Sequence, residues 1–348
     1  MTVATYIEAM PKVDLHVHLE GAISKNMMLV IADQNDVSES VKHFNTWVNL
    51  LEKPEYDRLE ELIRVVSGWV RQPEDLTRLA YEAGTHLARQ NVRYAEITVS
   101  PALYNEITLT PEQFFAAIND GRDRAQRAWG IDISWILAFP REEPRKADDL
   151  VRFATSPAGR RAGVVAIGLV GKENVQPVGQ FERAFAAAEK KGIARVPHAG
   201  DVYGAEGIDK AVTQLLPNRI ADAWGAADSQ PLIDTLVEQK IALDLSLPRA
   251  VAMKKIPSLK EYPLRKLYDD GVLVTLGSDM PVLFKTTLTD QYRQMIDVLG
   301  FAMDELEDIA LNAVRVCLLP DDSRAELLIE YQNEYERLRM EHIAPQTT

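Results

Sequence analysis

The stretch KVDLHVHLEG, from Lys12 to Gly21, is the part of the chain from which the fold and the chemistry are best inferred. Residues Val13–Val17 are rich in β-branched and apolar side chains and predict a strand. His16 and His18 lie two positions apart, and residues i and i+2 of a strand point to the same side. Both imidazoles can therefore converge on one metal ion at the end of this strand. A single His-x-His pair is often incidental, so further ligands are needed to support the hypothesis.

The rest of the sequence alternates short β-rich runs with longer helical patterns. Further strands are predicted at Tyr94–Val99, Ser134–Ala138, Val164–Val170, Ala194–Pro197, Arg219–Ile220, Ile241–Leu245 and Val272–Leu276. Helical segments are predicted at Glu74–Gln90, Pro111–Ala128, Val178–Lys191 and Pro231–Lys240. Eight apolar strands alternating with helices indicate a parallel sheet covered on both faces. We expect an α/β fold of the (β/α)8 TIM-barrel type, although doubly wound sheets share this alternation.

A long segment, residues 38–69, separates the first and second predicted strands. It carries Phe44, Trp47, Leu50, Leu51 and Tyr56, which favour helices with an apolar face. Such helices could form a lid above the barrel mouth. The alternative is an extra packing layer outside the barrel. No linker divides the chain, so we expect residues 1–348 to form one barrel domain that contains this insertion.

Composition and charge restrict the classes of partner. The chain of 348 residues has a net charge of −13, which disfavours nucleic acids and anionic membranes because their phosphates would be repelled. The single cysteine, Cys317, cannot form an internal disulfide and is expected to pack in the core. Neither a signal peptide nor a membrane-spanning apolar run is found, so a cytoplasmic location is the default expectation. We expect a small-molecule substrate, and the oligomeric state stays open.

Two more polar residues follow predicted strands. His198 comes directly after ARVP, and Asp279 comes after VLVTLGS at the end of the last strand. The carboxyl ends of barrel strands meet at one mouth, where the chemistry of this fold is found. Three histidines and one carboxylate form a ligand set typical of zinc with one open position for water. The sequence therefore predicts one zinc ion per chain, held by His16, His18, His198 and Asp279.

The run MPKVDLHVHLEGA, from Met10 to Ala22, resembles the signature of the adenosine deaminase family in the amidohydrolase superfamily. Further motifs occur in the family's order over nearly the whole chain: Gly171 after the fourth strand, His198-Ala199-Gly200, and Ser278-Asp279 followed by Pro281. The resemblance implies a (β/α)8 barrel, one zinc with the four ligands named above, and Gly171 as a backbone contact for a purine base. It also implies purine metabolism, in which hydroxide held on zinc replaces the amino group of adenosine or adenine.

The sequence departs from this family at the residues that transfer protons. The family's Glu after His-Ala-Gly, which protonates a ring nitrogen of the base, is here Asp201. The family's Arg-Ile-Gly-His-Gly is here Arg219-Ile220-Ala221-Asp222-Ala223, so Asp222 replaces an imidazole. The second Asp of the family's Ser-Asp-Asp-Pro is here Met280, which cannot take a proton. Asp201 and Asp222 are the candidate catalytic residues, and Met280 joins Gly171 as a candidate substrate contact.

Three functions remain open at this stage. The first is a purine deaminase that tolerates the altered residues, with activity on adenosine that is reduced. The second is a zinc hydrolase whose pocket was reshaped, by divergence or redesign, for another substrate class. The third is a catalytically impaired relative that still binds metal. Asp222 has its own alternatives, since instead of acting as a base it could ligate the metal itself, cap backbone groups, or form a salt bridge with Arg219 or Arg249.

Overall fold

The computed structural model describes residues 2–343 and contains eight parallel strands in that range. The strands are β1 (Lys12–His18), β2 (Val92–Val99), β3 (Asp132–Pro140), β4 (Val164–Val170), β5 (Ala194–Pro197), β6 (Arg219–Ala221), β7 (Ala242–Leu245) and β8 (Val274–Leu276). Every predicted strand overlaps one of them, and β4 and β5 have the predicted bounds. The predicted α/β barrel architecture is confirmed.

The strands form two hydrogen-bonded sheets, β1 to β5 and β6 to β8, which two isolated bridges join into a ring. One bridge pairs Val17 with Asp279, and the other pairs His198 with Ala221. At the first bridge, the His18 amide donates to the Asp279 carbonyl at 2.8 Å. The barrel therefore closes at the residues that the sequence predicts as metal ligands, which fixes their backbones relative to one another.

Strands β7 and β8 begin later than predicted, and the turns before them explain the difference. The amide of Ile241 donates to the Leu236 carbonyl at 2.9 Å, and the amide of Val272 donates to the Leu267 carbonyl at 3.0 Å. These amides still satisfy carbonyls of the preceding helices, so their residues cannot join the sheet ladder. The apolar side chains of Ile241 and Val272 predict strand residues. In the structure, their amides hydrogen-bond to the ends of the preceding helices instead.

Helices surround the ring. They are α1 (Val3–Ala9), α6 (Pro73–Ala88), α7 (Pro111–Trp129), α8 (Ala147–Ala154), α9 (Pro157–Arg161), α10 (Glu182–Lys190), α11 (Gly204–Leu215), α12 (Gln230–Glu238), α13 (Leu247–Ala252), α14 (Leu264–Asp269), α15 (Pro281–Phe284), α16 (Leu288–Asp297), α17 (Met303–Val316) and α18 (Asp321–His342). Helix α7 begins where predicted and ends one residue later, and local chemistry explains both ends: a capping box joins Thr110 to Gln113 at its start. Gly130, at φ 70°, ends it in the left-handed conformation. Among the described helices, none has both the length and the apolar character needed to cross a lipid bilayer.

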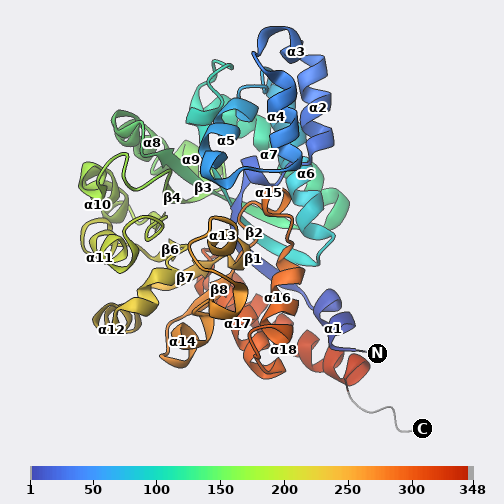
Figure 1. Cartoon of the computed structure of the whole chain (residues 1–348), viewed down its shortest axis with the longest axis vertical. Helices are drawn as coiled ribbons and strands as arrows, with labels where there is room; N and C mark the ends of the chain where they lie inside the picture. The colour runs from blue at the N-terminus through green and yellow to red at the C-terminus, as the bar shows by residue number, and fades with distance from the viewer. Residues whose placement is uncertain (1, 344–348) are drawn as a thin grey trace.

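Four helices between β1 and α6 gather at one end of the molecule (Figure 1). They are α2 (Lys25–Gln34), α3 (Val37–Ser40), α4 (Phe44–Glu52) and α5 (Leu59–Ser67). Two contacts connect this group to the loops of the barrel mouth: Lys172 Nζ lies 3.4 Å from Glu60 Oε2, and the Tyr56 hydroxyl donates to the Leu283 carbonyl at 3.2 Å. Four residues of α5 line the pocket at the mouth: Leu59, Glu60, Ile63 and Arg64. The segment thus forms part of the pocket wall in addition to packing outside the barrel.

The barrel interior below the mouth contains a buried ion-pair network. Arg219 Nη2 lies 2.5 Å from Glu96 Oε2, and Arg219 Nε lies 2.8 Å from Asp244 Oδ2. All three side chains are at most 1% exposed. A buried guanidinium is tolerated only when its charge and hydrogen bonds are satisfied, as they are here. Arg219 therefore belongs to the core, and it is not the partner of Asp222.

Candidate metal centre and active site

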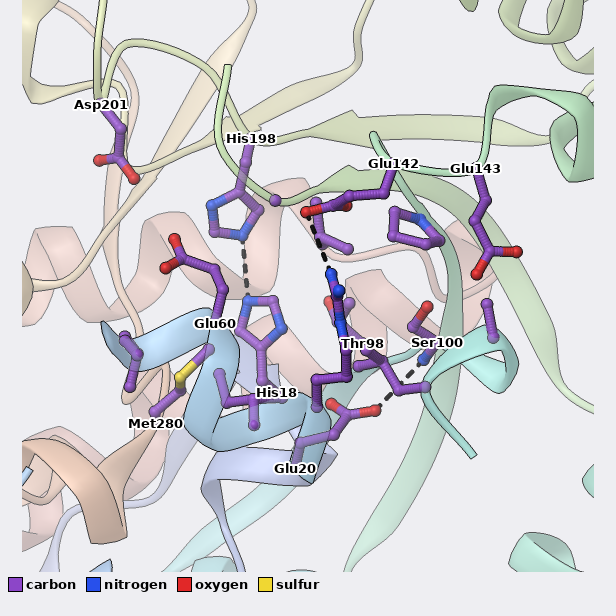
Figure 2. A pocket seen from close by; sticks show the side chains of 18 of the residues that line it. His18, Glu20, Glu60, Thr98, Ser100, Glu142, Glu143, His198, Asp201 and Met280 are labelled. Atoms are coloured by element: carbon purple, nitrogen blue, oxygen red, sulfur yellow. Dashed lines mark hydrogen bonds and ion pairs between the residues drawn. The ribbon is translucent and has the colours of Figure 1, made fainter. Parts of the chain in front are cut away.

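The four predicted ligands come from three separated segments that meet at the carboxyl ends of the strands. His16 and His18 lie on β1, His198 follows β5 and Asp279 follows β8. All of them are buried or nearly so, with His16 2% and Asp279 0% exposed. The rings of His18 and His198 face each other in the pocket (Figure 2). The barrel thus brings together residues that lie up to 263 positions apart in the sequence, from His16 to Asp279.

The distances between the ligand atoms fit one metal ion. His18 Nε2 lies 3.0 Å from His198 Nε2 and 3.6 Å from Asp279 Oδ1, and His16 Nε2 lies 3.7 Å from the same oxygen. In a tetrahedral zinc site with bonds of 2.0–2.1 Å, ligand atoms lie about 3.3 Å apart. The donor set and its spacing therefore suit an ion of this kind.

Several buried atoms in this cluster have no hydrogen-bond partner among residues 2–343. They are His16 Nδ1 and Nε2, Asp279 Oδ1, and both carboxylate oxygens of Asp222. Burying unpaired polar atoms is unfavourable, and a cation held jointly by one atom each of His16, Asp222 and Asp279 would satisfy three of them. Burial lowers the pKa of His16, and it lowers the pKa of His18 to about 3. The imidazoles are therefore neutral at pH 7, which is the form that binds metals.

Asp222 is a fifth group at the same centre. Its Oδ2 lies 3.6 Å from His16 Nε2 and 3.5 Å from His198 Nδ1, and it could hold an ion together with His16 and Asp279. Asp222 and Asp279 both have positive φ, 57° and 56° respectively. Non-glycine residues in this region are strained and collect at functional sites. Burial raises the pKa of Asp222, so a nearby cation is needed to keep this carboxylate ionised.

Arg249 is the main residue of the site that we did not assign to it from the sequence. It lies on α13, is 8% exposed, and places its guanidinium among three carboxylates. Its Nη2 lies 2.7 Å from Asp201 Oδ2, its Nε lies 3.2 Å from Asp222 Oδ2, and its Nη1 lies 3.3 Å from Asp279 Oδ2. The sequence suggests Arg249 only as an alternative salt-bridge partner of Asp222, and this contact is present. An arginine just after a barrel strand was the available signal.

The contact with Arg249 determines the protonation of Asp201. Burial by itself would raise the pKa of Asp201, but the charge and hydrogen bond of Arg249 outweigh it and lower that pKa. At neutral pH, Asp201 therefore accepts hydrogen bonds. A carboxylic acid that protonates a substrate needs a raised pKa instead. Asp201 therefore lines the pocket as an ionised hydrogen-bond acceptor and not as a proton donor.

The two candidate substrate contacts also line the pocket. Gly171, after β4, has φ 93°, and a Cβ added there would lie 3.0 Å from Glu142 Oε2. The positive φ favours glycine here, and an added Cβ would also displace the Glu142 carboxylate slightly. Met280 is 7% exposed and packs directly over Gly21, where an added Cβ would meet the Met280 Cβ. Met280 therefore supplies an apolar surface close to the ligand cluster.

A parallel eight-stranded barrel with histidine and aspartate side chains at its mouth is the architecture of metal-dependent barrel hydrolases. The family model described as adenosine deaminase matches residues 11–333. The chain belongs to the adenosine deaminase family. It is thereby an enzyme of the hydrolase class that acts on C–N bonds of cyclic amidines.

Related proteins match over nearly their whole length. An aminodeoxyfutalosine deaminase of Streptomyces avermitilis is 30% identical, over 94% of this chain and 91% of the relative. The adenosine deaminase of Bos taurus is 28% identical, over 91% of this chain and 92% of the relative. A solved amidohydrolase of Burkholderia ambifaria with bound zinc superimposes with a TM-score of 0.88 at 24% identity, covering 97% and 94% of the two chains. The two deaminases differ in the substrate that their names give, and the solved amidohydrolase shares the fold.

Proposed function

We propose that this protein is a zinc-dependent hydrolase that deaminates an adenosine- or adenine-type purine. The single observation that carries this proposal is the convergence of His16, His18, His198 and Asp279, with their unpartnered buried atoms, at the mouth of an adenosine deaminase barrel. When bound, one zinc ion would supply Lewis-acid activation of water near neutral pH. In the reaction, water adds to the ring carbon that bears the amino group, the C–N bond breaks, and ammonia leaves.

Within this proposal Asp222 is the base. Its carboxylate lies within 3.6 Å of His16 Nε2 and 3.5 Å of His198 Nδ1, so it faces the place where the attacking water must sit. Arg249 Nε, at 3.2 Å, holds Asp222 Oδ2 in position and favours its charged form. Asp222 thus takes over the proton-accepting role of the imidazole that related sequences carry at this position.

Asp201, Gly171 and Met280 are the proposed substrate contacts. Gly171 offers its backbone at the end of β4, and Met280 supplies an apolar surface for a flat ring. Asp201 remains a proposed catalytic residue that acts through hydrogen bonds at the substrate. Because Arg249 keeps it ionised, we expect it to transfer a proton to a ring nitrogen inefficiently, which predicts slow turnover of adenosine.

A metal analysis combined with an ammonia-release assay over adenosine, adenine and other aminopurines tests this function. We expect one zinc per chain, ammonia release that is lost on chelation and restored by zinc, and a fall of about 100-fold in kcat for Asp222→Asn. The variant Glu238→Gln, at an exposed position on α12, is the matched control and should keep full activity. Ammonia release that persists without metal, or no release from any aminopurine, would contradict the proposal.

The Arg249–Asp201 contact favours a second candidate, a zinc hydrolase whose pocket serves another substrate class. Its substrate would need no proton from Asp201. The triple variant Asp201→Glu, Asp222→His and Met280→Asp distinguishes the two functions. A sharp gain of adenosine deamination would favour the second candidate, whereas little change or a loss would favour the first.

A further inference from the structure

The pocket has two chemically different sides. His18, His198 and Asp201 lie on the side of the metal centre, whereas Glu142, Glu143 and Ser100 lie on the wall away from it (Figure 2). This wall is formed by the ends of β2 and β3 together with the loops that follow them. If the reacting carbon sits at the ligand cluster, the rest of the substrate extends toward this second wall, which we call the distal wall.

Acidic groups predominate among the charged side chains of the pocket. Of the described residues that line it, six carry carboxylates and two carry guanidiniums. The carboxylates belong to Glu20, Glu60, Glu142, Glu143, Glu173 and Asp201, and the guanidiniums to Arg64 and Arg249. Both guanidiniums are already engaged: Arg249 contacts three carboxylates, and Arg64 Nη2 lies 3.5 Å from Glu142 Oε1. A phosphate or carboxylate on a substrate would therefore meet mostly carboxylates in the described pocket, with Arg64, 57% exposed, as the one guanidinium held only in a weak pair.

Ser100 supplies an independent sign that this wall binds a ligand. Its side chain is buried, with the residue 2% exposed, and its hydroxyl has no hydrogen-bond partner among residues 2–343. The Ser100 amide donates to Glu20 Oε1 at 3.4 Å, so a carboxylate contacts the backbone of the same residue. An unpaired buried hydroxyl on a pocket wall is accounted for when a ligand completes its hydrogen bond. The neighbouring carboxylate favours a ligand group that donates hydrogen bonds.

The pairing of Glu142 with Arg64 is weak enough for a ligand to replace. Arg64 is 57% exposed and Glu142 is 28% exposed, and ion pairs at such exposed positions contribute little stability. Glu143 pairs with Lys146, which is also exposed and does not line the pocket. A cation that enters the pocket can therefore replace the surface partner of either carboxylate, and its charge-assisted hydrogen bond would be stronger there than the surface pair.

We propose that the distal wall, formed by Ser100, Glu142 and Glu143, together with Glu20 after β1, binds a positively charged ammonium or amidinium substituent of the substrate. This inference rests on the proposed deaminase function and specifies its substrate class. The enzyme then prefers an aminopurine that carries a cationic side group over its uncharged analogue, and it discriminates most strongly against a phosphorylated one.

Three ligands that differ at one position test the proposal with the zinc-loaded full chain: adenosine, 5′-amino-5′-deoxyadenosine and AMP. We measure kcat/KM for ammonia release and, separately, the dissociation constant by calorimetry with the slow Asp222→Asn variant. Both readouts should favour the aminated nucleoside over adenosine by about tenfold, since one charge-assisted hydrogen bond is gained. AMP should fall below adenosine by at least a similar factor.

Variants of the wall separate charge recognition from general damage. The double variant Glu142→Gln and Glu143→Gln should reduce the preference for the aminated nucleoside to about twofold or less, measured as a ratio to adenosine. The control Glu238→Gln makes a like-signed change on an exposed part of α12 that does not line the pocket, and it should keep the full preference.

The outcomes distinguish this inference from the proposed reaction. If none of the ligands is deaminated but the aminated one binds tightest and loses that advantage in the double variant, the distal wall is supported and the reaction is wrong. If AMP is used or bound as well as adenosine, or the double variant keeps the preference, the inference is wrong although deamination stands. Failure of all three ligands to bind would also overturn it.

Discussion

Replacing Arg249 by methionine should increase zinc affinity while it destabilises the metal-free protein. The Arg249 guanidinium is 8% exposed and lies 2.7–3.3 Å from carboxylate oxygens of Asp201, Asp222 and Asp279. Removing one partner of a buried ion pair costs about 3–5 kcal/mol because the remaining charges stay buried and uncompensated. In the metal-free Arg249→Met variant we expect a loss of this size.

The loss should be smaller when zinc is bound. The ion would then compensate Asp222 and Asp279, so that only the contact with Asp201, whose side chain is 22% exposed, is lost. A contact at that exposure is worth about 1 kcal/mol. The metal-free protein therefore loses at least about 2 kcal/mol more than the loaded protein. By the thermodynamic cycle, zinc affinity rises by at least about 30-fold.

Two measurements check this cycle: urea unfolding of both forms and competition for zinc against a chelator of known affinity. Arg265→Met is the matched control, since Arg265 is 35% exposed and pairs with Glu305 on the surface. It should change stability by about 1 kcal/mol or less and leave zinc affinity unchanged. Equal losses in the metal-free and loaded forms of Arg249→Met, or weaker zinc binding, would refute the reasoning.

Three further predictions concern single residues of the site. His18→Ala should lower zinc affinity by at least about 100-fold, measured as zinc per chain after dialysis against a metal buffer, and undiminished zinc content would remove His18 from the ligand set. Asp14 lies on β1, two residues before His16, and is fully buried. Burial raises the pKa of Asp14 to about 7, so its contribution to stability is full below pH 3.8 and is lost as the pH rises through 7. The metal-free Asp14→Asn variant should therefore become more stable relative to the parent as the pH rises from 4 to 8, by up to about 4 kcal/mol in urea unfolding. A difference in unfolding free energy that does not change with pH would contradict this. Gly171→Ala should lower both stability, by about 1–2 kcal/mol, and substrate affinity at constant zinc content. The matched control is Gly192→Ala, because Gly192 has φ 71° and an added Cβ there would have no atom within 4 Å. This control should lower stability and leave substrate affinity unchanged. Equal substrate affinity in the two variants would argue against a role for Gly171.

Periodicity and turn chemistry predicted most of the fold because both are local properties. The runs Val164–Val170 and Ala194–Pro197 are apolar and bounded by turn residues, and each forms a strand with the predicted ends. Ile241 and Val272 were assigned to strands by their apolar character, yet their amides cap helices. Such a choice depends on which carbonyl lies within reach, and the sequence pattern does not contain that information.

The sequence by itself determined the barrel and the residues that converge on its mouth. The His16–His18 spacing, together with His198 and Asp279 after strands, was sufficient because every parallel strand of a barrel ends at the same mouth. Only the tertiary structure decided how the surrounding charges are arranged. Arg249 is distant in sequence from Asp201 and Asp279, and its contacts with them depend on the packing of α13 against the mouth. Electrostatic interactions depend on distances in space between residues that are far apart in the sequence. The ionised state of Asp201 and the grouping of acidic residues in the distal wall therefore follow from the tertiary structure and not from the sequence pattern.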